Sequence, residues 1–325
     1  MFIADCHCDT LTELYKQNKS LWNNDLMLDA QRIIHNGGGL QFLAMFIPTE
    51  EFRWGGGTRY TLKLIDTYLR EIKSMEQSGI KVHRILSKKD VNDVLKYQFN
   101  TLLAIEEGGA VGGKARTGGA LDGSLEALRV YYELGVRCMT LVWSNRNDIA
   151  DGVNEECSKG GLTTFGRQVV TEMNRLGMGI DVSHISTYGF WDVLERSEKP
   201  IIATHSCAYS LCDHIRNLRD DQLRALARQD GFVGVNFAGQ FLEKNWEDAC
   251  IESVYKHLSY MMDVMGNDDH IGFGSDFDGI KHPPKDLKKV EMFSDLFDYL
   301  QGKFSSETLE KISYKNCLAY LKKVL

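Results

Sequence analysis

Short apolar segments recur along the chain and predict eight strands, each bounded by glycine or by polar turn residues. Almost every position in these segments is apolar, which is typical of strands buried on both faces of a parallel sheet. They cover residues 2–7, 41–46, 102–106, 138–143, 179–184, 201–205, 232–237 and 271–276. Between most of them the apolar residues follow helical spacing, over residues 58–78, 124–134, 165–176, 187–195, 220–228, 250–265 and 306–325.

Strand and helix therefore alternate, and eight such strands in 325 residues match the size of a (β/α)8 TIM barrel with insertions. We expect an α/β protein with a single (β/α)8 domain over residues 1–325. An open, doubly wound sheet is the alternative. No GxGxxG or GxxxxGK[ST] motif follows a predicted strand, so nothing indicates a dinucleotide or nucleoside triphosphate site.

Composition and charge exclude several classes of function. A content of 43% hydrophobic and 26% charged residues is that of an ordinary globular chain, and 38 Lys and Arg against 45 Asp and Glu give a net charge of −7. This charge disfavours nucleic acid and anionic membrane surfaces as partners. No apolar run reaches the roughly 20 residues that span a bilayer. The start, MFIADCHCDT, lacks a basic segment followed by an apolar one, so we expect a cytoplasmic location.

Residues of the kinds that bind metal ions stand at the ends of five predicted strands. They are His7 and Asp9, Glu106, His184, His205 and Asp276. In a parallel barrel all carboxyl ends open onto one face, so these side chains should converge. A single histidine at a strand end is usually an ordinary polar residue. Three of the nine histidines in this position, together with carboxylates, predict a shared metal site.

The number of these ligands favours two metal ions over one. Imidazole and carboxylate ligands together suit zinc, and five ligands exceed what one tetrahedral catalytic Zn²⁺ uses. A bridging carboxylate would divide them between two Zn²⁺ per chain, with a bridging hydroxide as the nucleophile. Asp276, at the last strand, is placed to take a proton from that water and to pass it to a leaving amine.

These motifs resemble the membrane (renal-type) dipeptidase family of zinc metallopeptidases, which have amidohydrolase-like barrels. The resemblance runs from end to end of the chain, through DCHCDT, AIEEGG, IDVSH, ATHSCAYSLCDHIRN and GFGSDFDG. It implies a binuclear zinc enzyme that hydrolyses dipeptides, often with a D-residue at the C-terminal position. It also implies a possible homodimer.

The resemblance assigns a role to each candidate residue. His7 and Asp9 would bind the first ion, Glu106 would bridge, His184 and His205 would bind the second, and Asp276 would be the acid and base. Arg216, in the segment HIRN, would hold the substrate carboxylate, because a guanidinium binds a carboxylate through two parallel hydrogen bonds. Asn217 beside it would add a neutral hydrogen bond.

Two positions leave alternatives open. Glu106 and Glu107 are adjacent, and strand alternation favours Glu106 as the ligand and points Glu107 to the opposite side. Relatives of the mammalian enzyme carry a histidine that polarises the scissile carbonyl, where this chain has Trp143. An indole N–H donates one hydrogen bond but carries no charge. Asn145, Arg146 or Asn147 would then compensate, and Trp143 becomes a candidate substrate-binding residue.

Other functions remain as alternatives to a dipeptidase. The same barrel hosts many chemistries, so a metal-dependent amidohydrolase or decarboxylase acting on another small carboxylate is possible. A non-catalytic metal-binding relative is a third interpretation, although the complete ligand set argues against it. The segment 49–58, which contains Trp54 and three glycines, is a candidate loop over the site.

Overall fold

Eight parallel strands close into a barrel in the computed structural model, which describes residues 1–52, 55–110 and 118–325. The barrel strands are β1 (Ile3–Asp5), β2 (Gly39–Phe46), β4 (Phe99–Glu106), β5 (Val136–Thr140), β6 (Gly179–Asp181), β7 (Ile202–Ala203), β8 (Phe232–Val235) and β9 (Ile271–Phe273). Their order around the barrel is β1, β2, β4, β5, β6, β7, β8, β9, and β9 pairs with β1 again. The predicted (β/α)8 barrel is confirmed, and the open sheet is wrong.

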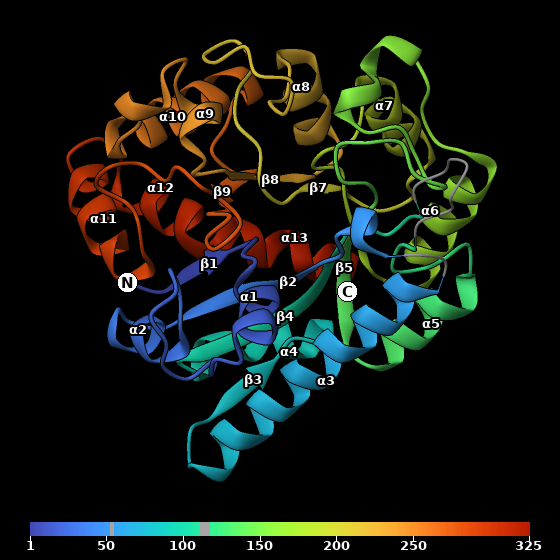
Figure 1. The fold of residues 1–325 in the computed structure, drawn as a ribbon. Helices are drawn as coiled ribbons and strands as arrows, with labels where there is room; N and C mark the ends of the chain where they lie inside the picture. Colours follow the sequence, from blue (N-terminus) through green and yellow to red (C-terminus); the bar gives the residue numbers. More distant parts are fainter. Residues whose placement is uncertain (53–54, 111–117) are drawn as a thin grey trace.

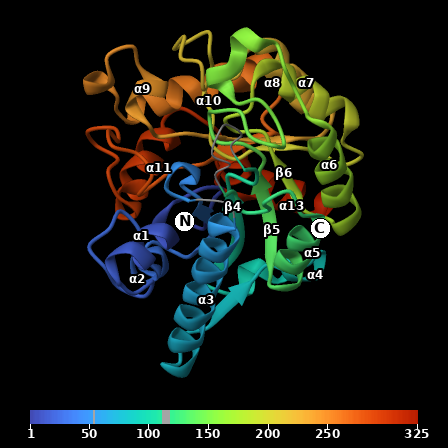
Figure 2. The same cartoon turned by 45° about the vertical axis from the view of Figure 1, so that its right-hand side comes forward.

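A ninth strand, β3 (Val82–Arg84), escaped prediction because it is only three residues long and half-buried. It pairs with the first residues of β4, Phe99 to Thr101, whereas β5 pairs with the part of β4 from Leu103 to Glu106. β3 therefore extends the sheet at the amino end without entering the closed ring. It follows the long helix α3 (Gly56–Gln77), which projects from the barrel in Figures 1 and 2.

Apart from the C-terminal one, the predicted helices surround the barrel on its outside (Figure 1). Besides α3 they are α5 (Leu125–Glu133), α6 (Thr164–Leu176), α7 (Thr187–Arg196), α8 (Asp220–Arg228) and α10 (Ile251–Met265). The predicted C-terminal helix is divided into α12 (Ser306–Glu310), a π-helical turn (Lys311–Lys315) and α13 (Asn316–Val324). Several begin at a hydroxyl that accepts a backbone N–H of the first turn, such as Thr163 before α6 and Ser186 before α7.

The remaining helices are mostly short and were not predicted. They are α1 (Thr10–Gln17), α2 (Ala30–His35), α4 (Lys88–Asp93), α9 (Gly239–Leu242) and α11 (Phe293–Gln301). Single 3-10 turns cover Thr49–Glu51, Val94–Lys96, Val153–Ser158, Trp246–Asp248 and Val290–Met292. None of the helices in the described parts of the chain is both long and apolar enough to cross a bilayer.

Strand alternation decides which side chains reach the mouth of the barrel. On β4, Leu102 and Ala104 belong to an apolar cluster shared with side chains of α13, whereas Leu103 and Ile105 pack in the other cluster, with the surrounding helices. Glu106 has the same parity as Leu102 and Ala104 and therefore follows them into the barrel.

Candidate functional site

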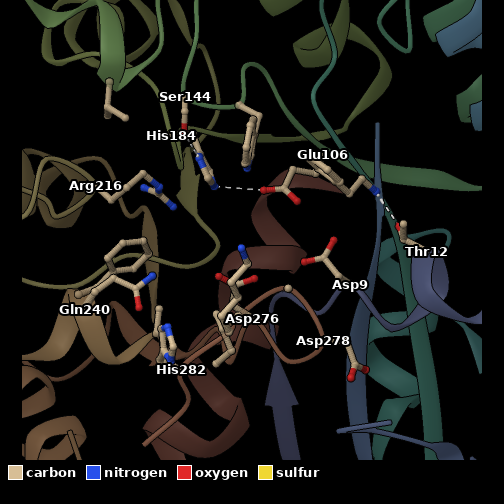
Figure 3. A pocket seen from close by; sticks show the side chains of 18 of the residues that line it. Asp9, Thr12, Glu106, Ser144, His184, Arg216, Gln240, Asp276, Asp278 and His282 are labelled. Carbon is tan, nitrogen blue, oxygen red and sulfur yellow. Dashed lines mark hydrogen bonds and ion pairs between the residues drawn. The ribbon is translucent and has the colours of Figure 1, made fainter. Parts of the chain in front are cut away.

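A cavity of about 570 Å³ opens at the carboxyl ends of the strands. Its size is typical of sites for small molecules. Six of the nine residues singled out from the sequence line it, namely Asp9, Glu106, Trp143, His184, Arg216 and Asp276. Figure 3 shows the labelled members of this set pointing toward one another from the ends of different strands and the segments that follow them. His7 and His205 are buried beside Glu106.

Glu106 lies at the centre of the site and offers each oxygen to a different set of neighbours. Its Oε2 is 3.4 Å from His7 Nε2. Its Oε1 is 3.1 Å from His184 Nε2 and 3.6 Å from His205 Nε2. This one carboxylate therefore joins two groups of candidate ligands.

The first group consists of His7, Asp9 and Glu106, and the second of Glu106, His184 and His205. Within each group the candidate ligand atoms lie within 4.8 Å of one another. His7 Nε2 is 3.6 Å from Asp9 Oδ2, and neither His7 Nε2 nor Asp9 Oδ1 has a hydrogen-bond partner in the described chain, although both are buried. Buried polar atoms are rarely left without partners, so these donor atoms fit divalent cations.

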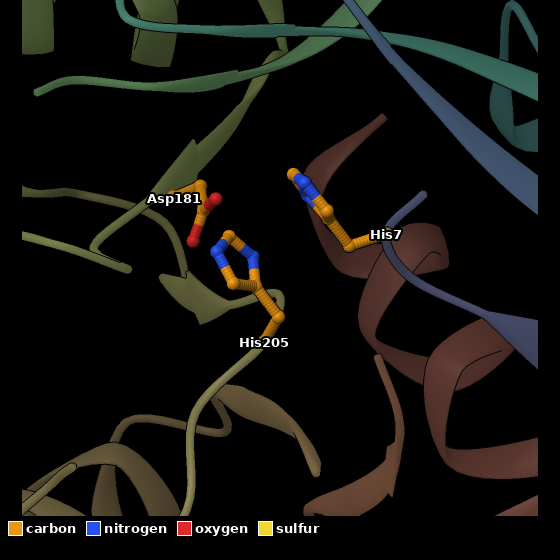
Figure 4. A group of neighbouring side chains, drawn as sticks. All are labelled: His7, Asp181 and His205. Carbon is orange, nitrogen blue, oxygen red and sulfur yellow. The ribbon is translucent and has the colours of Figure 1, made fainter. Parts of the chain in front are cut away.

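A third group, His7, Asp181 and His205, lies within the same distance limit but serves another purpose (Figure 4). The Asp181 carboxylate accepts hydrogen bonds from the hydroxyls of Thr140 and Thr204 and from the backbone N–H of Ser183 and of Thr204. Both Asp181 oxygens therefore already accept hydrogen bonds, and Asp181 positions other residues behind the site.

Asp181 orients His205 through Thr204. The Thr204 hydroxyl donates to Asp181 Oδ2 at 2.6 Å and lies 2.8 Å from His205 Nδ1, so its oxygen accepts the Nδ1–H. His205 Nε2 is then left with its lone pair, which is the tautomer that binds a metal. The Ser144 hydroxyl lies 2.9 Å from His184 Nδ1 and holds that ring by a hydrogen bond. The Nε2 atoms of His184 and His205 lie 2.9 Å apart, and both face Glu106.

Glu107 points away from the cavity and fixes the chain behind it. Its carboxylate accepts hydrogen bonds from the backbone N–H of Trp143 at 2.6 Å, from Asn147 Nδ2 at 2.5 Å and from the backbone N–H of Gly109 at 3.2 Å. Burial raises the pKa of Glu107 to about 8. Its φ of 78° is in the left-handed region, and this turn separates the directions of Glu106 and Glu107.

Asp276 faces the His7 side of the site. Its Oδ2 accepts a hydrogen bond from Asn236 Nδ2 at 2.9 Å, and its Oδ1 is 3.9 Å from His7 Nε2. Burial raises the pKa of Asp276 to about 8. A side chain at Gly279 would place a Cβ 2.0 Å from Asp9 Oδ2 and 2.5 Å from Asp276 Oδ1, so only glycine leaves room for both carboxylates.

The charges of the inner side chains are set by burial and by one another. Burial disfavours a charge on His7, but Glu106 and Asp9 outweigh it and raise its pKa well above the usual value. Burial also opposes ionisation of Glu106, yet His7 and His184 lower its pKa. Burial and the nearby Arg216 guanidinium lower the pKa of His184 to about 4. The carboxylate at the centre is thus stabilised in its charged form.

Arg216 and Asn217 are adjacent in sequence but have different surroundings. Arg216 is only 6% exposed, donates from Nη2 to the His205 carbonyl at 3.2 Å and has an Nε without a partner in the described chain. Asn217 is not among the described residues that line the large cavity. Its Nδ2 donates to the carbonyls of Cys212 and Phe241, both at 2.8 Å. These contacts support a structural role for Asn217, and the substrate contact predicted for it stays a prediction.

Trp143 lines the cavity, but the residues expected to compensate for it do not. Asn147 holds Glu107, Arg146 forms an ion pair with Asp151, and Asn145 accepts a hydrogen bond from Asn154. The polar residues near Trp143 that do line the cavity are Ser144 and Asn154.

Several cavity residues were not identified from the sequence. They include Phe46, Ser144, His214, Gln240 and His282. Most of them are ordinary residue types in loops, without a motif to mark them; the position of Phe46 at the end of a predicted strand was the one available signal. Trp54 lies outside the described residues.

Comparisons with known proteins found a matching family model and similar structures. A family model described as "Membrane dipeptidase (Peptidase family M19)" matches residues 1–325. The metallopeptidase of Rhodobacter sphaeroides, solved with a phosphinate mimic of the dipeptide L-Ala-D-Ala, is 25% identical with a TM-score of 0.87. That match covers 100% of this chain and 99% of the other.

Two curated relatives match over part of their length. The "Uncharacterized protein in pqqA 5'region" of Klebsiella pneumoniae is 36% identical, over 63% of this chain and 79% of that protein. "Dipeptidase aclJ" of Aspergillus oryzae is 40% identical, over 55% of this chain and 43% of that protein. The chain thus spans about half the length of the fungal relatives that it matches.

Proposed function

Because the chain belongs to the membrane dipeptidase family of metallopeptidases, we propose that it hydrolyses dipeptides at a centre of two zinc ions. One observation carries the proposal: Glu106 presents one oxygen to His7 and the other to His184 and His205. A carboxylate shared in this way suits a pair of ions, each with its own histidine ligands.

The residues at the site divide into two sets of ligands. His7 and Asp9 would hold one ion, His184 and His205 the other, and Glu106 both. Nitrogen and carboxylate ligands without a thiolate suit zinc in a catalytic site. When bound, the ions supply Lewis acidity that makes water a nucleophile at neutral pH and polarises a carbonyl oxygen.

Asp276 is placed to move the proton that hydrolysis requires. Its Oδ1 faces the His7 side of the cavity, while Asn236 holds Oδ2 and so fixes the orientation of the carboxylate. Cations bound beside Asp276 would favour its ionised form over the protonated one that burial favours. A carboxylate so held can take the proton of the attacking water and deliver it to the leaving amine. The hydrogen bond from Asn236 and the orientation of Oδ1 both suit Asp276 to this role.

Arg216 is placed to bind the C-terminal carboxylate of a dipeptide. It is buried at the cavity wall, and its Nε has no partner among the described residues, so a carboxylate arriving there would complete its hydrogen bonding. Recognition of this terminus would place the last peptide bond of the substrate at the metal ligands. The Rhodobacter sphaeroides relative binds a mimic of L-Ala-D-Ala, and we extend the tolerance of a D-residue at the C-terminal position to this chain.

A panel of L-L and L-D dipeptides, assayed for release of free amino acids with and without a chelator, tests this function. We expect hydrolysis that the chelator abolishes and that added zinc restores. N-acetyl amino acids and simple carboxylic acids serve as the comparison substrates. Turnover of these compounds without turnover of any dipeptide would instead support an amidohydrolase or a decarboxylase, and zinc binding without any turnover would support a non-catalytic relative.

A cytoplasmic location and a homodimer are predictions that accompany this proposal. Light scattering of the purified, zinc-loaded protein measures its mass, and cell fractionation measures its location.

A further inference from the structure

The wall of the cavity beside Glu106 is formed by two aromatic side chains. Phe46 and Trp143 pack edge to face, with ring centroids 5.1 Å apart and an interplanar angle of 61°. Trp143 also lies against the His184 ring, at 5.9 Å. Both aromatic residues line the cavity, and Trp143 is 37% exposed. An apolar surface therefore lies next to candidate metal ligands.

This wall is held in place before any substrate binds. The buried Glu107 carboxylate accepts the backbone N–H of Trp143 at 2.6 Å, and the Thr12 hydroxyl accepts the backbone N–H of Phe46 at 3.0 Å. Phe46 shares the parity of Phe42, which points into the barrel. Anchored backbones reduce the ordering cost of binding, so such a surface can select among ligands.

The order of the strands places the Phe46 end of this wall opposite the arginine. Phe46 ends β2, and Arg216 lies in the loop after β7. Four steps separate β2 from β7 in either direction around the barrel, through β1, β9 and β8 or through β4, β5 and β6. Trp143 follows β5, two steps from β7. A dipeptide whose carboxylate binds Arg216 would therefore extend across the site past Trp143 and toward Phe46.

From this arrangement we infer that Phe46 and Trp143 form an apolar subsite for the side chain of the N-terminal residue of the dipeptide, and that large aliphatic or aromatic residues are preferred there. The inference rests on the proposed dipeptidase function and adds the substrate class to it. The scissile carbonyl belongs to the N-terminal residue, so the side chain of that residue lies beside the metal ligands, on the side away from Arg216.

A series of dipeptides with alanine as the constant C-terminal residue tests the subsite. Gly-Ala, Ala-Ala, Leu-Ala and Phe-Ala are compared by kcat/KM. Differences of one or a few methylene groups in an apolar pocket change kcat/KM by about tenfold to a hundredfold, so we expect Leu-Ala and Phe-Ala to exceed Gly-Ala by at least about tenfold. Trp143→Ala should reduce this preference by about tenfold, and Trp143→Phe should retain most of it.

Trp246→Ala is the matched control. Trp246 is 41% exposed and stacks on His282, but it is not among the described residues that line the cavity. Its removal should leave the preference unchanged. If Trp143→Ala does not fold, as judged by circular dichroism, Phe46→Ala replaces it with the same expected loss of preference.

The outcomes separate this inference from the proposed function. Hydrolysis of all four dipeptides at similar kcat/KM, or a preference that survives both Trp143→Ala and Phe46→Ala, would overturn the subsite and leave the dipeptidase function standing. Failure to hydrolyse any dipeptide in the zinc-loaded protein would overturn the proposed function and the subsite together.

Discussion

Replacing Thr204 by valine removes one hydroxyl and keeps the shape of the side chain. That hydroxyl donates to Asp181 Oδ2 and accepts from His205 Nδ1. Thr204 is buried, so water does not replace the lost oxygen. In Thr204→Val the Nδ1–H of His205 lacks its acceptor, and the tautomer with a protonated Nε2, which does not bind metal, becomes more populated.

Two independent magnitudes give the loss of zinc affinity that we expect for Thr204→Val. A buried donor that loses its partner costs about 1–3 kcal/mol. Removing the hydrogen-bond partner of a metal-binding histidine usually weakens metal affinity about tenfold to a hundredfold, which corresponds to about 1.4–2.7 kcal/mol. The two agree, so Thr204→Val should bind zinc about tenfold to a hundredfold more weakly than the wild type.

Competition for zinc with a chromophoric chelator at pH 7 measures this loss. Thr140→Val is the matched control, because the Thr140 hydroxyl also donates to Asp181 but the structure records no hydrogen bond from it to His205. We expect the control to lose stability while its zinc affinity stays within about threefold of the wild type. Equal affinity in Thr204→Val and the wild type, or equal weakening in the two variants, would refute the orienting role of Thr204.

Three further variants test other parts of the molecule. Asp276→Asn should keep zinc content by metal analysis and lose about a hundredfold or more in kcat, because the amide does not accept the proton; full activity would remove its acid and base role. Arg216→Ala should raise KM for dipeptides about tenfold to a hundredfold without changing zinc content, and an unaltered KM would contradict carboxylate binding. His257 is buried and neutral, accepts from the Ala208 N–H, and burial lowers its pKa to about 4. Because the unfolded state, with a pKa near ~6.5, binds more protons between pH 6.5 and 4, the free energy of unfolding should fall by up to ~3 kcal/mol as the pH drops through this window. Urea unfolding at several pH values should show this fall in the free energy of unfolding for the wild type and not for His257→Gln. An equal dependence on pH in the two proteins would contradict it.

The barrel could be predicted because its strands are buried on both faces and therefore appear as nearly continuous apolar runs. β3 and the short helices α1, α2, α4 and α9 have no such pattern, since they are short, partly exposed and positioned by tertiary contacts. Glu106 could be distinguished from Glu107 by strand alternation alone, and the structure shows the two side chains on opposite sides.

The candidate ligands could be predicted because histidine and carboxylate side chains at strand ends are chemically distinctive. Thr204 and Ser144 could not, because a hydroxyl beside a histidine has no signature until the fold brings the two together. The substrate contact predicted for Asn217 stays a prediction. Its neighbour Arg216 lines the cavity, but the N–H groups of the Asn217 amide bind two backbone carbonyls that the sequence does not bring near.

Stepwise addition of zinc to the metal-free protein, with bound zinc and L-Ala-D-Ala hydrolysis measured on the same samples, tests the central claim most directly. If Glu106 joins two ion sites, binding should saturate at about two zinc ions per chain, and hydrolysis should rise to its maximum over the same additions. Saturation at one ion with full hydrolysis would contradict the two-ion centre, and zinc binding without hydrolysis of any dipeptide would contradict the dipeptidase.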